Sequence, residues 1–92
     1  MSWFSNLFAS KRVMPTSLCD ENFDAQVLKS DRLTLVDFWS PGCAPCKQLE
    51  DVIIGIASDK AETVKVCELN ITDGMQIAAR YGVRGTPTVI YF

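Results

Sequence analysis

The sequence contains no histidine among its 92 residues. Histidine is the usual general base near neutral pH and the commonest metal ligand, so any chemistry here must rely on thiols and carboxylates. Basic residues are also few, with nine Lys and Arg against eleven Asp and Glu and a net charge of −2, which argues against a nucleic-acid-binding protein. No run of about 18 apolar residues occurs, so we expect no membrane-spanning helix.

Cysteine is too sparse for a disulfide-stabilised secreted scaffold. The chain has four, at positions 19, 43, 46 and 67, and its hydrophobic fraction of 48% is enough for an ordinary core. The N-terminal residues lack the order of a signal peptide, because the apolar residues precede Lys11 and Arg12 instead of following them. We therefore expect a cytoplasmic protein with one small domain over residues 13–92, preceded by an aromatic-rich segment over residues 1–12.

Hydrophobic patterning predicts strands and helices in alternation. We expect strands over 13–18, 33–39, 64–69 and 87–92, with helices over 20–29, through 49–57, and over 75–81 before Gly82. The apolar face of the middle helix would contain Leu49, Val52, Ile53, Ile56 and Ala57. This alternation predicts an α/β fold with at least one parallel pair of strands.

Cys43 and Cys46 lie in the stretch SPGCAPCK, where a buried strand gives way to a helix. The unpaired backbone N–H groups of the first helical turn favour a thiolate, and the pKa of such a cysteine often falls to ~7 or lower, from about 8.5 for a free thiol. Pro45 suits an early helical position. Cys46, one turn further on, should be more buried and less acidic, so that Cys43 attacks a disulfide and Cys46 resolves the mixed disulfide.

Two other interpretations of this cysteine pair remain open. Zinc usually requires four ligands, whereas the sequence offers one pair, no histidine, and two isolated cysteines on other predicted elements. A purely structural disulfide would close a very short loop and stabilise the fold little. Both fit the sequence less well than redox exchange does. The isolated Cys19 and Cys67 fit small core hydrophobes.

The stretches VDFWSPGCAPCK and YGVRGTPTVIYF together resemble the thioredoxin family, and the resemblance covers residues 18–92. It implies a thioredoxin-like fold, a central mixed sheet flanked by helices, without the family's last strand and helix. It further implies a thiol–disulfide oxidoreductase that reduces protein disulfides through Cys43 and Cys46. Asp37 resembles the family's buried carboxylate, which assists proton transfer at Cys46. Burial raises the pKa of a carboxyl group, which suits such a role; the alternative is a strand-end Asp bound to backbone amides.

The same resemblance implies a substrate-binding surface. Thr86–Pro87 corresponds to a cis peptide that faces the cysteines and leaves the Thr86 backbone free to pair with an extended segment. The residues that we assign to substrate binding are Trp39, Gly42, Ala44, Pro45, Gly85, Thr86 and Pro87. No cofactor is expected beyond the dithiol, which a thioredoxin-reductase-like donor would recharge, and the substrates would be disulfide-containing proteins. The alternative hypothesis is a thioredoxin-fold binding module with weak or no turnover.

The sequence departs from the family pattern around the motif. Gly42 stands where the family has tryptophan, Ala44-Pro45 where Gly-Pro is commonest, Asp51 where a proline kinks the helix, and Glu68 where lysine is common. A Glu68 that points inward would raise the pKa of Asp37 further.

The sequence also stops after TVIYF, where chains of this family continue into another strand and a helix. We expect residues 87–92 to form an exposed, uncharged sheet edge. Such an edge is a template for pairing with another chain, so self-association through this strand is a further prediction.

Overall fold

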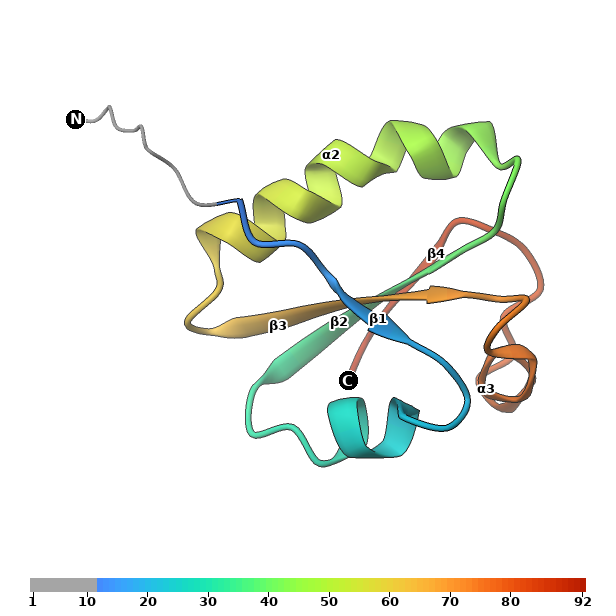
Figure 1. Cartoon of the computed structure of the whole chain (residues 1–92), viewed down its shortest axis with the longest axis horizontal. Helices are drawn as coiled ribbons and strands as arrows, with labels where there is room; N and C mark the ends of the chain where they lie inside the picture. Colours follow the sequence, from blue (N-terminus) through green and yellow to red (C-terminus); the bar gives the residue numbers. More distant parts are fainter. Residues whose placement is uncertain (1–11) are drawn as a thin grey trace.

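The computed structural model describes residues 12–92 (Figure 1), and the predicted aromatic-rich segment lies outside the described residues except for Arg12. The elements alternate as the sequence predicts: β1 (Thr16–Leu18), the helical turn η1 (Asp24–Leu28), β2 (Leu33–Trp39), α2 (Ala44–Asp59), β3 (Val64–Asn70), α3 (Met75–Arg80) and β4 (Thr88–Tyr91). Within residues 12–92, no helix has the length and apolar character needed to cross a membrane.

The four described strands form one mixed sheet in the order β1-β3-β2-β4. β3 pairs in parallel with both β1 and β2, whereas β4 runs antiparallel to β2. The apolar run of β2 is buried from Thr34 to Phe38, as expected of a strand covered on both faces. Its register places Asp37 between Glu68 of β3 and Val89 of β4. The sheet therefore fixes which side chains surround Asp37.

Helices cover both faces of the sheet, with α2 on one side and η1 and α3 on the other (Figure 1). Two hydrophobic clusters fill the layers between them. Under α2 the buried members are Leu35, Ile53, Ala57 and Val66. On the opposite face they are Leu18, Phe23, Val27, Val36, Phe38, Cys67, Leu69 and Ile77. The α/β thioredoxin-like architecture expected from the sequence is confirmed.

The first predicted helix is shorter than expected. Residues 20–22 form a turn, and only Asp24–Leu28 is helical, with π-type geometry in which Lys29 N–H donates to Asp24 C=O at 3.1 Å. The Asn22 side chain explains the turn, because its Oδ1 accepts from Cys19 N–H at 2.8 Å and its Nδ2 donates to Ser17 C=O. Such side-chain bonds compete with helix formation.

The apolar face of α2 is also rotated from the predicted one. Val52 is 55% exposed, whereas Ile54, which the prediction omitted, is 7% exposed. The reason is that the buried face is centred on Cys46, Ile53 and Ala57, and at about 100° per residue Val52 lies farther from that centre than Ile54 does.

β4 lies at the outer edge of the described sheet, as predicted, with Val89 and Tyr91 exposed. Self-association through residues 87–92 stays a prediction. Of the two isolated cysteines, Cys67 is fully buried in the core, whereas Cys19 is only half-buried. The expectation that both behave as core residues is therefore wrong for Cys19, which sits in the turn held by Asn22.

Candidate active site

The paired cysteines lie where β2 passes into α2 through a short turn. Cys43 N–H donates to Ser40 C=O at 3.3 Å across this turn. Gly42 has φ +77°, a left-handed conformation that favours glycine. Cys43 is the N-cap of α2, and Pro45 occupies the first turn, where its missing N–H removes no helical hydrogen bond. The turn thus delivers Cys43 to the positive end of the helix, as the sequence predicts.

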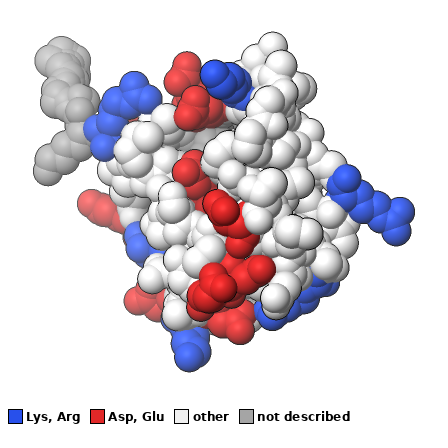
Figure 2. Space-filling model, turned by 45° about the vertical axis from the view of Figure 1, so that its right-hand side comes forward, with Lys and Arg blue, Asp and Glu red and all other residues white. Residues whose placement is uncertain are grey.

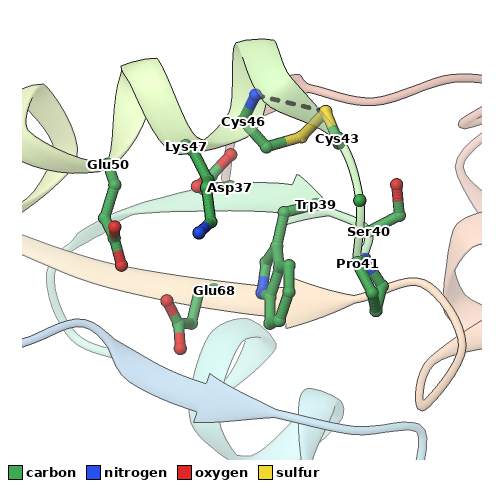
Figure 3. A pocket seen from close by; sticks show the side chains of 10 residues that line it. Asp37, Trp39, Ser40, Pro41, Cys43, Cys46, Lys47, Glu50 and Glu68 are labelled. Atoms are coloured by element: carbon green, nitrogen blue, oxygen red, sulfur yellow. Dashed lines mark hydrogen bonds between the residues drawn. A yellow bond between two sulfur atoms is a disulfide. The ribbon is translucent and has the colours of Figure 1, made fainter.

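Cys43 and Cys46 form a disulfide, with their Cα atoms 5.2 Å apart (Figure 3). The Sγ of Cys43 accepts a hydrogen bond from Cys46 N–H at 3.1 Å. The two cysteines differ in exposure as expected, since Cys43 is half-buried and Cys46 is 7% exposed. Backbone N–H groups directed at Cys43 stabilise negative charge on its sulfur once the disulfide is reduced.

A second loop lies against the cysteine turn. The Thr86–Pro87 peptide bond is cis, as the family resemblance implies. Thr86 Oγ1 and Ser40 Oγ share a hydrogen bond of 2.7 Å, which joins the two loops. Within residues 12–92, the backbone N–H and C=O of Thr86 make no backbone hydrogen bond. They are therefore free to pair with an incoming chain.

A pocket of about 280 Å³ opens beside the disulfide (Figure 3). Its lining residues are Asp37, Trp39, Ser40, Pro41, Gly42, Cys43, Cys46, Lys47, Glu50 and Glu68. Five of the site residues assigned from the sequence line this pocket together: Asp37, Trp39, Gly42, Cys43 and Cys46. Ala44, Pro45, Gly85, Thr86 and Pro87 lie outside this lining, and the role of each in substrate binding stays a prediction.

Asp37 lies in this pocket with its side chain 6% exposed, and no described residue donates a hydrogen bond to its Oδ1. This is contrary to the alternative in which backbone amides satisfy the carboxylate. Desolvation by burial, and secondarily the negative charge of Glu68, raise the pKa of Asp37 to about 6. The Nε1 of Trp39 is also buried, and no residue among 12–92 accepts a hydrogen bond from it. Asp37 can therefore take up or release a proton near neutral pH.

Glu68 points to the same side of the sheet as Asp37, because the two residues are register partners on β3 and β2. Its Oε2 accepts a hydrogen bond of 3.4 Å from Ser17 Oγ on β1. Glu68 also lines the pocket with Asp37, so of the two orientations that the sequence leaves open the inward one is found.

Sequence reasoning missed Glu50 and Lys47, which also line the pocket. The signal was the spacing: Glu50 follows Cys46 by four residues, and side chains four apart share one face of a helix.

The arrangement of the described side chains does not favour a metal site. No group of three or more Cys, Asp or Glu side chains within residues 12–92 is arranged to hold a metal ion. Cys19 and Cys67 take no part in the disulfide and are free thiols. The chemistry available at this site is exchange between a dithiol and a disulfide, with one carboxyl group at hand for proton transfer.

Known proteins with similar sequences are named thioredoxins. The model of the thioredoxin family matches residues 14–92. A thioredoxin from Rickettsia bellii is 42% identical over 79 residues, which cover 86% of this chain and 75% of the relative. A thioredoxin from Pseudomonas aeruginosa is 41% identical over 76 residues, covering 83% and 70%; one from Porphyra purpurea is 38% identical over 77 residues, covering 84% and 72%. The chain therefore belongs to the thioredoxin family.

Proposed function

We propose that this thiol–disulfide oxidoreductase reduces disulfides in other proteins, with Cys43 as the attacking residue. In the reduced form, the Cys43 thiolate attacks one sulfur of the substrate disulfide. A bond forms between Cys43 Sγ and that sulfur, and the other substrate sulfur leaves as a thiolate. The position of Cys43 as the N-cap of α2, half-exposed beside the pocket, supports this assignment.

In the second step, Cys46 resolves the mixed disulfide. The Asp37 carboxylate accepts the Cys46 proton, and the resulting thiolate attacks Cys43 Sγ. The disulfide of Figure 3 forms, the substrate leaves as its second thiolate, and two electrons have passed from the protein to the substrate. A carboxyl group whose pKa lies at about 6 serves as a base near neutral pH.

Partners of two kinds follow from this cycle. A substrate protein would add an extended segment beside the unpaired backbone of Thr86, and an external thioredoxin-reductase-like donor would return the disulfide to the dithiol. In this proposal no separate cofactor is needed, and the protein works in the cytoplasm, where thiols are kept reduced.

The observation that carries the proposal is the conjunction of the Cys43–Cys46 pair with Asp37, whose buried Oδ1 has no hydrogen-bond partner among the described residues. A binding module without turnover would require neither two thiols nor a carboxyl group with a raised pKa.

The test is reduction of a protein disulfide, such as those of insulin, with dithiothreitol as the electron source. Cys43→Ser should abolish the protein's contribution. Cys46→Ser should lose turnover, and the pre-reduced variant mixed with insulin after removal of dithiothreitol should accumulate a mixed disulfide that mass spectrometry detects. Cys19→Ser, the matched control at a free half-buried cysteine, should retain turnover. Parent protein that reduces insulin no faster than dithiothreitol alone would instead support the binding-module hypothesis.

A further inference from the structure

The pocket beside the disulfide contains more negative than positive charge. Three carboxyl groups line it, those of Asp37, Glu50 and Glu68, together with a single cation, Lys47. The three come from β2, α2 and β3, so separate elements converge on one space (Figure 3). Figure 2 views the molecule with the end where α2 begins turned toward the reader. A column of acidic side chains runs down the middle of that face.

Lys47 balances only part of this negative charge. Lys47 points toward the pocket (Figure 3), but the only salt bridge among residues 12–92 joins Arg80 to Asp24, at 3.0 Å. Glu68 accepts a single bond, from Ser17 Oγ, and Asp37 Oδ1 accepts none from the described residues. A carboxyl oxygen buried to this degree without a donor is costly, and a ligand that brings a donor relieves that cost.

The remaining walls of the pocket favour an organic cation. Trp39 contributes an aromatic ring, whose face attracts ammonium and guanidinium groups. The carboxyl groups are spread around the pocket, and among residues 12–92 no three of the candidate ligands are arranged for a metal ion. A volume of about 280 Å³ accommodates the end of a long side chain. An aliphatic stem would lie against the indole ring while its charged end meets the carboxylates.

We propose that this pocket binds a lysine or arginine side chain of the partner protein, close to the disulfide that is being exchanged. The inference rests on the proposed function, because Cys43 and Cys46 form one wall of the same pocket. It adds a specificity determinant to that function: Glu50 and Glu68 select substrates that carry a basic residue near the reactive cysteine. A cation in this position also reduces the repulsion between Glu68 and Asp37.

The test uses short peptides that contain one disulfide and differ only in one residue. Lysine or glutamine is placed in turn at each position within two residues of the cysteine. The rate at which each peptide oxidises the reduced protein is followed at low and high salt. We expect at least one lysine peptide to react about 3- to 10-fold faster than its glutamine counterpart at low salt, with the advantage reduced at high salt.

Variants identify the pocket as the origin of this preference. Glu50→Gln combined with Glu68→Gln should abolish the lysine advantage. Glu21→Gln combined with Glu62→Gln, which removes the same two charges from exposed positions outside the pocket lining, should preserve it. The quantity compared is the ratio of the rates of the lysine and glutamine peptides on the same variant. A general loss of stability or activity lowers both rates and leaves this ratio unchanged.

The outcomes separate the two proposals. Equal rates for lysine and glutamine peptides at every position, or an advantage that survives in the double variant, would overturn the cation pocket while leaving disulfide reduction intact; water would then be its occupant. Failure of the protein to react with any peptide, together with failure to reduce insulin, would overturn the proposed function itself.

Discussion

At the scale of the single residue, Gly42 holds the turn that presents Cys43. Its φ of +77° lies in the left-handed region, although a Cβ atom at this position would meet nothing within 4 Å. Backbone conformation, not space, is therefore what restricts the residue. A Cβ atom at Gly55, in the middle of α2, would also meet nothing within 4 Å. The two glycines differ in backbone conformation, because that of Gly55 is helical and accepts any L-residue.

We predict opposite effects of alanine at these two glycines. Gly42→Ala should lower the free energy of unfolding by about 1 kcal/mol, because a non-glycine residue is strained at positive φ. Gly55→Ala should raise it by about 0.5–1 kcal/mol, because alanine restricts the unfolded chain and favours helix. Urea unfolding of the two variants measures both effects. A Gly42→Ala protein as stable as the parent would contradict the assigned conformation of the turn.

Asp37 and Glu68 allow a prediction about the pH dependence of the reaction. The Asp37 carboxylate must be ionised to accept the Cys46 proton, so turnover should fall as the pH drops below about 6. Asp37→Asn should remove this inflection and lower the rate at pH 7 by about 10-fold or more. Glu68→Gln should shift the inflection to lower pH, because the negative charge of Glu68 raises the pKa of Asp37.

Rapid-mixing measurements of mixed-disulfide resolution between pH 5 and 8 would test both variants. Glu62→Gln, at an exposed position outside the pocket lining, provides the matched control and should retain the parental profile. An unchanged inflection in Asp37→Asn would show that another group accepts the proton.

Residues of the site differ in how well the sequence reveals them. Cys43, Cys46 and Asp37 stand out because each breaks its local pattern: two thiols at a turn, and a carboxylate inside an apolar strand. Glu50 does not stand out, because an exposed charged residue on a helix is ordinary, and its place beside the disulfide follows only from the packing of α2 on the sheet. The raised pKa of Asp37 likewise depends on burial and on the register with Glu68.

At the scale of the element, α3 is stabilised by a residue far away in sequence. Gly74, its N-cap, provides no side chain to satisfy the first N–H groups. Asp20 supplies it instead: its carboxylate accepts hydrogen bonds from Gln76 N–H at 3.3 Å and from Ile77 N–H at 3.0 Å. Asp20 belongs to the range 20–29 that the hydrophobic pattern predicts to be helical, so its contact with α3 helps to explain why residues 20–22 form a turn instead.

We predict that Asp20→Ala lowers the free energy of unfolding by about 1 kcal/mol, because two N–H groups at the start of α3 lose their acceptor and the helix loses a favourable charge at its positive end. Asp31→Ala serves as the control, since the exposed Asp31 makes no side-chain hydrogen bond within the described part of the chain. Chemical denaturation gives both values. Equal losses in the two variants would exclude a specific capping role for Asp20.

The elements also differ in how far local sequence determines them. β2 and α2 were predicted with small errors because each has a long, regular apolar pattern. η1 was predicted poorly, because its extent depends on hydrogen bonds from Asn22 and on the use of Asp20 elsewhere in the fold. Such long-range contacts leave no periodic signal in a single sequence.

At the scale of the whole molecule, alternating strands and helices were sufficient to predict an α/β fold, and the family motifs specified its type. The antiparallel placement of β4 beside β2 is not determined by the alternation alone, because helix-connected strands are ordinarily parallel. The hydrogen bond shared by Thr86 Oγ1 and Ser40 Oγ connects the loop before this strand to the cysteine turn. The site is thus a property of the assembled sheet.

The sequence contains no histidine, whose titration would otherwise contribute to stability near neutral pH. Without histidine, a side chain titrates between about pH 5 and 7 only if its surroundings shift its pKa into that range. The pKa of Asp37 is shifted in this way, so Asp37 should dominate the change in stability across that range. Its pKa is about 6 in the folded state and 3.8 as a free group. The folded state therefore binds more protons than the unfolded state between these values, and the contribution of Asp37 lowers stability as the pH rises.

The loss of stability caused by ionisation of Asp37 is complete above about pH 7 and absent below about pH 4. It corresponds to about 2 kcal/mol once access of solvent to the pocket is allowed for. Asp37→Asn should therefore be more stable than the parent by about this amount at pH 7.5, whereas the two proteins should differ little at pH 4. Paired urea titrations at the two pH values measure the difference, and an equal stability gap at both would show that ionisation of Asp37 is not its cause.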